Sequence, residues 1–157
     1  MPTPEANFWN TLKRNLPTNC HTTRIENRHG GGVPDVHIVW AGLVFWLELK
    51  TTKNNSVRIS PHQIAWNTAY SRSGGLSFIL VKHLSSGDLF LFRGAKSLDL
   101  GRSGLATEAE FRGSGYDNLW AAIRESGSGF GTSGFGVGDH RALDQGAGTG
   151  APVQQQQ

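Results

Sequence analysis

The feature that most constrains this 157-residue chain is a pair of apolar runs separated by a single dipeptide. The runs cover residues 33–40 and 43–50, and Ala41-Gly42 lies between them. Short runs rich in Val, Leu, Phe and Trp and bounded by glycine are typical of β-strands. Glycine readily adopts the positive φ angle that a tight two-residue turn requires. The sequence therefore predicts a β-hairpin over this stretch.

Such a hairpin would gather two carboxylates and a lysine on one face of the sheet. Counting back from a two-residue turn places Asp35 opposite Glu48, and side chains opposed across antiparallel strands have Cβ atoms about 5 Å apart. Lys50 follows Glu48 by two positions, so it points to the same face. Two unpaired carboxylates this close repel each other, and one pKa rises sharply unless a cation lies between them.

Two interpretations fit this arrangement. Glu48 and Lys50 taken alone are compatible with an ordinary ion pair on a strand. The proline before Asp35, the spacing of the two acids and the apolar strand around Glu48 favour a divalent metal site instead. Oxygen ligands suit Mg²⁺ or Mn²⁺, which keep several bound waters in proteins. We expect Mg²⁺, with Mn²⁺ able to substitute for it.

The pattern P-D-x12-E-L-K, which ends at Lys50, resembles the signature of the PD-(D/E)XK nuclease superfamily. Its surroundings, between residues 4 and 92, resemble phage and VRR-Nuc-type members and the related Holliday-junction resolvases. The resemblance implies that Asp35 and Glu48 hold the metal, with the main-chain carbonyl of Leu49 as a further ligand. It implies a catalytic Lys50 that acts either as a general base or as an electrostatic clamp on the phosphate.

Two predicted helices are expected to reach the same site. Residues 4–16 form the first, and the resemblance implies that its Glu5 completes the metal site directly or through water. The alternative is that Glu5 only complements the helix dipole. Residues 60–72 form the second helix, where Ser60 and Gln63 have the spacing of a capping box. Gln63 therefore either caps its own helix or, as the resemblance implies, serves as a catalytic residue.

The first 96 residues are basic, with 11 Lys and Arg against 5 Asp and Glu. A surplus of positive charge favours a polyanionic partner, and nucleic acid is the commonest. Glu26 lies between two arginines and is either their charge partner or a further acid near the metal. Four basic residues flank the hairpin and are predicted to contact DNA phosphates: Arg24, Arg28, Lys53 and Arg58.

The remaining segments predict one α/β domain and a tail. Further strands are expected at residues 20–28, 76–81 and 89–93, which gives the order α-β-β-β-α-β-β. This order implies a restriction-endonuclease-like core, a mixed β-sheet flanked by helices.

The C-terminal third is harder to interpret. Residues 95–113 have no clear pattern, whereas Ser114 and Asp117 suggest a capping box at the start of a short helix that ends at Glu125. We assign residues 1–125 to the nuclease domain. We expect residues 126–157 to be a disordered tail, because a segment so rich in Gly and Gln cannot bury a core.

Together these features predict a Mg²⁺-dependent deoxyribonuclease that cuts DNA phosphodiester bonds as an endonuclease. The resemblance implies a phage-type Holliday-junction resolvase or branched-DNA nuclease. A resolvase would be a homodimer, because two symmetric cuts need two sites. The alternatives are a general duplex or single-strand DNA nuclease and a non-catalytic DNA-binding component. The chain has one cysteine and no run of transmembrane length, so we expect a cytoplasmic protein, in the host cytoplasm if it is phage-encoded.

Overall fold

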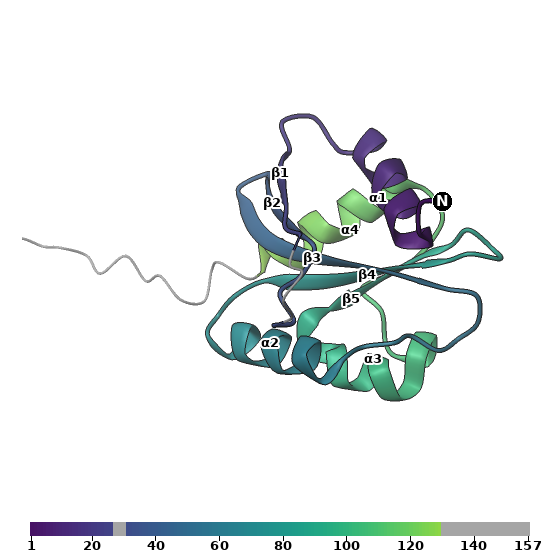
Figure 1. Ribbon diagram of the computed structural model, residues 1–157. Coiled ribbons are helices and arrows are strands. Elements are labelled where there is room, and N and C mark those ends of the chain that lie inside the picture. Colours follow the sequence, from purple (N-terminus) through teal and green to yellow (C-terminus); the bar gives the residue numbers. More distant parts are fainter. Residues whose placement is uncertain (27–30, 130–157) are drawn as a thin grey trace, which may run out of the picture.

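The computed structural model describes residues 1–26 and 31–129 (Figure 1). A single six-stranded sheet in the order β1-β2-β3-β4-β5-β6 forms its centre, and β3 and β4 are its parallel pair. The predicted α/β class, a mixed sheet flanked by helices, is confirmed. The elements are α1 (Pro4–Arg14), β1 (His21–Arg24), β2 (Val36–Trp40), β3 (Leu43–Thr52), α2 (Pro61–Arg72), β4 (Ser77–His83), β5 (Leu89–Arg93), α3 (Ser97–Ser103), β6 (Phe111–Gly113) and α4 (Tyr116–Ser128).

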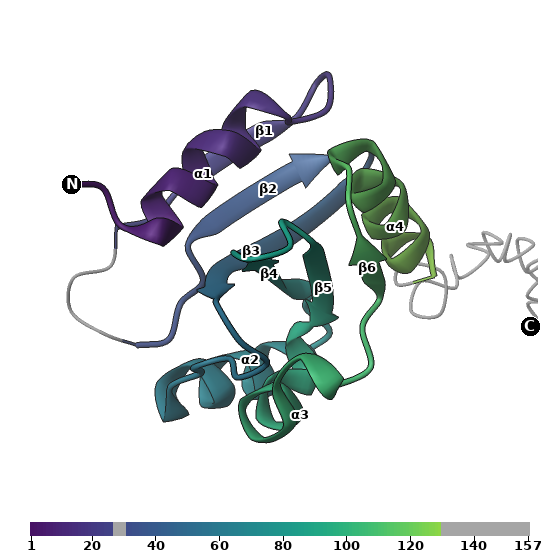
Figure 2. The same cartoon turned by 90° about the vertical axis from the view of Figure 1, so that its right-hand side faces the viewer.

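Helices cover the two faces of the sheet in pairs. Helices α1 and α4 lie on one face, and α2 and α3 lie on the other (Figure 1). Figure 2 shows that α1 runs beside β1 and β2, whereas α4 lies at the opposite end near β6. The core under α1 and α4 is the larger one and includes Phe8, Leu12, Ile38, Phe45, Leu80 and Leu119. The core on the other face includes Val57, Ile79, Phe90, Phe92 and Leu100.

The central hairpin forms with the predicted register. Val36 pairs with Leu47, and Trp40 pairs with Leu43 across the turn. Ala41 and Gly42 have φ angles of 53° and 75°. Positive φ at both central positions is the requirement of a type I′ turn, whose twist matches that of the flanking strands.

Helix α2 connects β3 to β4 and explains why this pair is parallel. Parallel neighbours need a crossover connection, which is usually a helix. Ser60 caps α2: its hydroxyl accepts a hydrogen bond from the backbone N–H of Gln63, and the Gln63 side chain accepts one from the Ser60 backbone. The predicted capping box is confirmed. The crossover places the first turn of α2 beside β3.

Two expectations for the chain outside the hairpin need correction, and one segment without a clear pattern is now defined. Residues 94–113 contain α3, β6 and two short 3-10 helices (Gly94–Lys96 and Gly104–Ala106). Helix α4 has Gly115 as its N-cap without a side-chain hydrogen bond, so the proposed box of Ser114 and Asp117 is wrong. The folded part also passes the expected boundary at residue 125, because α4 continues to Ser128.

The end of α4 belongs to the core rather than to a tail. Gly127 is buried, and an added Cβ there would meet the Leu43 side chain at 2.5 Å. Residues 130–157, the rest of the expected tail, lie outside the described residues. No helix in the described part of the chain is long and apolar enough to cross a membrane.

The turn at Ala41 gives the first testable prediction. A left-handed conformation costs an L-residue other than Asn or Gly about 1 kcal/mol, and type I′ turns favour Asn-Gly. Ala41→Asn should raise the free energy of unfolding by about 0.5–1 kcal/mol, measured by urea denaturation. The matched change Ala121→Asn, at an exposed position inside α4, should lower it, because Asn is a poorer helix former than Ala. Equal effects of the two changes would contradict the prediction.

Candidate active site

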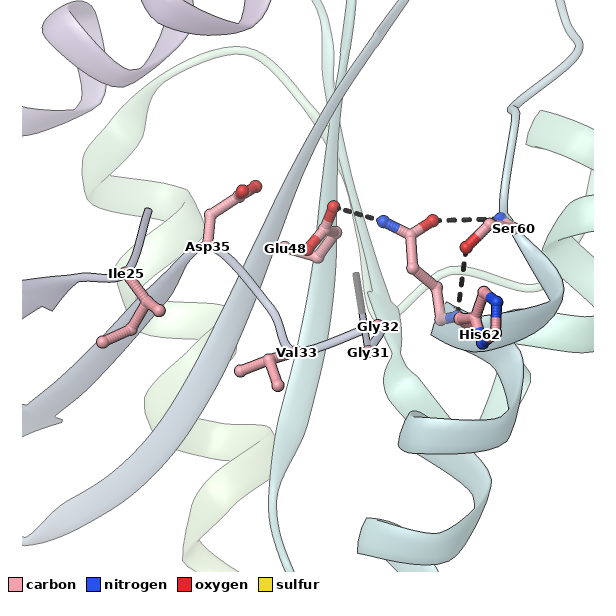
Figure 3. Close-up of a pocket in the computed structure, with 9 residues that line it drawn as sticks. Ile25, Gly31, Gly32, Val33, Asp35, Glu48, Ser60 and His62 are labelled. Atoms are coloured by element: carbon pink, nitrogen blue, oxygen red, sulfur yellow. Dashed lines mark hydrogen bonds between the residues drawn. The ribbon is translucent and has the colours of Figure 1, made fainter. Parts of the chain in front are cut away.

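Two carboxylates meet at a cavity of about 230 Å³ between the start of β2, the middle of β3 and the first turn of α2 (Figure 3). Asp35 directly precedes β2, and its Oδ2 accepts a hydrogen bond of 2.8 Å from the backbone N–H of Leu49. Its carbonyl accepts another of 2.8 Å from the backbone N–H of Ile25. Glu48 projects from β3 and is only 6% exposed. The hairpin therefore brings both predicted acids to one cavity.

Lys50 and Gln63 complete the polar cluster. The Lys50 ammonium lies 3.7 Å from Glu48 Oε1 and donates a hydrogen bond of 3.1 Å to Gln63 Oε1. Gln63 Nε2 donates one of 2.8 Å to Glu48 Oε1, which is the dashed line that reaches Glu48 in Figure 3. The four residues predicted as catalytic from the sequence thus lie together.

Gln63 makes the contacts of both interpretations, since it caps α2 and also reaches Glu48 and Lys50. Its amide oxygen accepts from the Ser60 backbone at 3.0 Å and from Lys50, while its amide nitrogen faces Glu48. This orientation of the amide is the one the neighbours require, because the backbone N–H and the ammonium are donors and the carboxylate is an acceptor. One side chain therefore caps α2 and ties the helix to the acidic pair.

The environment disfavours charge on both acids. Burial, followed by the nearby charge of Asp35, raises the pKa of Glu48 to about 8, although Lys50 and a hydrogen bond from the Asp35 backbone act in the opposite direction. Burial also raises the pKa of Asp35, against the lowering effects of the Leu49 hydrogen bond and of the charges on Lys50 and Arg24. A single lysine does not offset the cost of burying two carboxylates together.

The donor atoms at the cavity fit a hard divalent cation. Asp35 and Glu48 offer carboxylate oxygens. In a strand the N–H and C=O of one residue face the same neighbour, so the carbonyl of Leu49 faces Asp35 as its N–H does. The cavity has room for several waters, at about 30 Å³ each in the liquid, and Mg²⁺ usually retains waters in protein sites.

Glu5 does not line the cavity that Asp35 and Glu48 share. Among the described residues, no group of three or more His, Cys, Asp or Glu side chains is placed to hold a metal ion. The Glu5 carboxylate instead accepts a hydrogen bond of 3.0 Å from the Thr51 hydroxyl on β3. It remains close enough for its negative charge to raise the pKa of Asp35 slightly. The expected part of Glu5 in metal binding, directly or through water, stays a prediction.

The predicted DNA-contacting residues are spread around the site. The Arg24 guanidinium lies 5.6 Å from the centre of the Trp9 ring, and its charge acts on Asp35. Lys53 and Arg58 are exposed in the connection between β3 and α2, and neither lines the cavity. Arg28 lies outside the described residues. Glu26 is exposed and does not line the cavity.

The cavity also has a lining that the sequence did not reveal. Ser60, His62 and Gly32 line it together with the acids. Gly32 has a φ of +71°, and an added Cβ would lie 2.1 Å from the His62 carbonyl oxygen. Gly32 therefore lets the chain pass close to the start of α2. The position of His62 beside Gln63 was the available signal for its place at the cavity.

No protein-family model matches the sequence, and no curated protein is significantly similar to it. Among solved structures, the fold is similar to Hjc, a Holliday junction resolvase from the archaeal hyperthermophile Archaeoglobus fulgidus. The TM-score is 0.47 at 16% identity, over 59% of this chain and 74% of that one. The bacterial homing endonuclease I-Ssp6803I also has a TM-score of 0.47, at 12% identity, over 82% of this chain and 96% of that one. Similarities this distant assign neither an activity nor a substrate to the chain.

The pKa of Glu48 predicts how stability depends on pH in buffer with a chelator. The ordinary value is 4.5 and the folded value is about 8, so the folded protein binds the extra proton between these pH values. The free energy of unfolding should therefore be highest below pH 4.5. It should fall as pH rises from there through about 8, by at most about 1.4 kcal/mol per pH unit. Glu48→Gln should flatten this dependence in urea denaturation at several pH values. An unchanged slope in the variant would contradict the assignment.

Gly32 gives a second prediction for the site. Gly32→Ala should lower the free energy of unfolding by roughly 1 kcal/mol or more. The new methyl group clashes with backbone rather than with a mobile side chain. Gly42→Ala is the matched control, because its φ is +75° and no atom lies within 4 Å of the added Cβ. The two changes thus share the backbone strain, and the difference between their thermal unfolding midpoints measures the clash. Equal midpoints would show that the loop moves away at no cost.

Proposed function

We propose that the protein is a metal-dependent endonuclease that hydrolyses DNA phosphodiester bonds, and that it is a member of the PD-(D/E)XK superfamily. The observation that carries the proposal is the pairing of half-buried Asp35 with buried Glu48, beside Lys50, at one cavity. Such a pair is unfavourable for folding without a cation and suited to holding one. The sequence pattern around the pair supports the same proposal.

Mg²⁺ is the proposed metal, with Mn²⁺ as a substitute. Asp35, Glu48 and the Leu49 carbonyl would hold it, and Glu5 would act through water from the edge of the site. A bound divalent ion supplies charge neutralisation at the phosphate and lowers the pKa of a water nucleophile.

The chain's own residues then have distinct tasks. Lys50 would position or deprotonate the attacking water, or stabilise the phosphate charge, from its place between Glu48 and Gln63. Gln63 would keep Lys50 and Glu48 in position through its two hydrogen bonds. Both side chains come from rigid elements, a central strand and a capped helix, which favours a fixed geometry.

DNA is the proposed substrate because of the basic N-terminal part of the chain. Arg24, Lys53 and Arg58 would contact the phosphate backbone, as would Arg28. We favour a phage-type Holliday-junction resolvase or branched-DNA nuclease acting as a homodimer. A general duplex or single-strand nuclease is the alternative, and a non-catalytic DNA-binding component is the second one.

A cleavage panel tests the proposal. Four-way junction, flap, linear duplex and single strand are compared at equal concentration with Mg²⁺, with Mn²⁺ and with a chelator. Asp35→Asn and Lys50→Met should each lower the rate by at least about 100-fold and leave most DNA binding intact. Glu108→Gln is the control for the loss of one charge. Glu108 is 88% exposed and does not line the cavity, so this variant should cleave normally.

Metal binding needs a readout separate from cleavage. Mg²⁺ at ten times its dissociation constant should stabilise the wild type by about 1.4 kcal/mol, which thermal unfolding detects. Asp35→Asn should lose this gain and Glu108→Gln should keep it. Normal cleavage by Asp35→Asn would refute the proposed role of the pair. DNA binding without cleavage by the wild type would select the non-catalytic alternative.

A further inference from the structure

One side of the sheet stays open next to the cavity. On the face that carries Glu48, α2 packs against β4 and α3 packs against β5, whereas β1, β2 and the start of β3 carry exposed side chains: His21, Thr23, Val39 and Val44. The exposed fractions are 37% for Val39 and 54% for Val44, which are high values for apolar residues on strands. A strand face in water normally carries polar residues. This region therefore has a surface that packing of the described residues does not explain.

The pairing of the strands orders this surface into rows. The first row belongs to the cavity and contains Ile25, Asp35 and Glu48. Two further rows lie beyond it at steps of two residues, or about 6.6 Å each. We call their six residues the open face: Thr23, His37 and Trp46 in one row, and His21, Val39 and Val44 in the next.

The open face has aromatic and apolar groups in place of charges. None of its six residues is Lys, Arg, Asp or Glu. The rings of His37 and Trp46 lie 4.9 Å apart, and Trp66 of α2 supports Trp46 at 5.9 Å. Tyr70 in turn stacks on Trp66 at 4.6 Å, so the row of rings is anchored in the helix.

This composition suits the unpaired bases of a nucleic acid better than its phosphates. Duplex DNA presents phosphates, which proteins neutralise with Lys and Arg, and the open face has neither. Unpaired bases expose flat apolar surfaces that stack on aromatic side chains. The row spacing is about twice the 3.4 Å between successive nucleotides of a duplex strand, so it fits an extended strand with separated bases.

We propose that the open face binds unpaired nucleotides next to the scissile phosphate, one base per row. This inference rests on the proposed nuclease function and, of the two substrates favoured above, selects branched DNA with a single-stranded segment beside the cut over a fully paired Holliday junction. The occupant is nucleic acid rather than another surface because the rows continue directly from the acidic pair, with Ile25 shared between the cavity and the sheet edge. An arm of about two nucleotides would fill both rows.

The test uses duplexes with single-stranded arms of zero, one, two, four and eight nucleotides, on either strand. The Kd is measured by fluorescence anisotropy, and cleavage is measured in parallel. Affinity should rise with arm length and level off near two nucleotides. Val44→Glu and His37→Ala should each weaken binding of armed DNA about fivefold, the effect of about 1 kcal/mol of base contact, and leave blunt duplex unchanged. Val44→Trp should strengthen it by a similar factor, because it adds a stacking ring.

Leu98→Glu is the matched control, since Leu98 is 43% exposed on α3 away from the open face and the variant carries the same added charge as Val44→Glu. Equal effects of these two variants, or no effect of arm length, would overturn the proposal. So would a wild-type dimer that Val44→Glu alone converts to monomer, because the open face would then bind a second copy. A cleavage rate that does not depend on arm length would refute only this inference. Arm-dependent binding without cleavage would support this inference and refute the proposed nuclease activity.

Discussion

Burial of the Glu48 carboxylate in the middle of β3 sets the conditions for the rest of the site. An ionised carboxylate that leaves water costs several kcal/mol unless partners replace its hydration. The chain supplies two partners from different elements, the amide nitrogen of Gln63 at 2.8 Å and the ammonium of Lys50 at 3.7 Å. Neither partner offsets this burial or the repulsion from Asp35, so the pKa of Glu48 stays high. The polar cluster is thus fixed in geometry and still short of positive charge.

The topology makes this arrangement rigid. Because β3 and β4 are parallel, α2 must cross between them, and its first turn lies against the strand that carries Glu48. The same Gln63 side chain closes the capping box with Ser60 and bonds to the acidic pair. Loss of this amide would weaken the helix start and release Lys50 together. The position of the site is therefore coupled to the stability of the crossover helix.

The features that could be predicted from the sequence are those with a local cause. The hairpin register follows from a glycine turn between two apolar runs, and it fixes which acids share a face. The pairing of Glu5 with Thr51 could not be foreseen, because it depends on how α1 docks on β3. The combined contacts of Gln63 could not be foreseen for a similar reason, since spacing does not show which end of an amide meets which neighbour. Strand β6 has only three residues and exists through its pairing with β5, which leaves little pattern in the sequence.

The hairpin has to satisfy two demands with one register. One face places Ile38 and Phe45 in the larger core, and the other carries the acidic pair and the open face. A slip of one residue would exchange the two faces, burying the carboxylates under α1 and exposing the core. The cross-strand contact of Val39 with Val44 adds a few tenths of a kcal/mol to the correct register, but a pair of threonines has a comparable preference for strands. Stability alone thus gives a weak reason for two solvent-exposed valines, whereas contact with a bound nucleic acid gives a direct one.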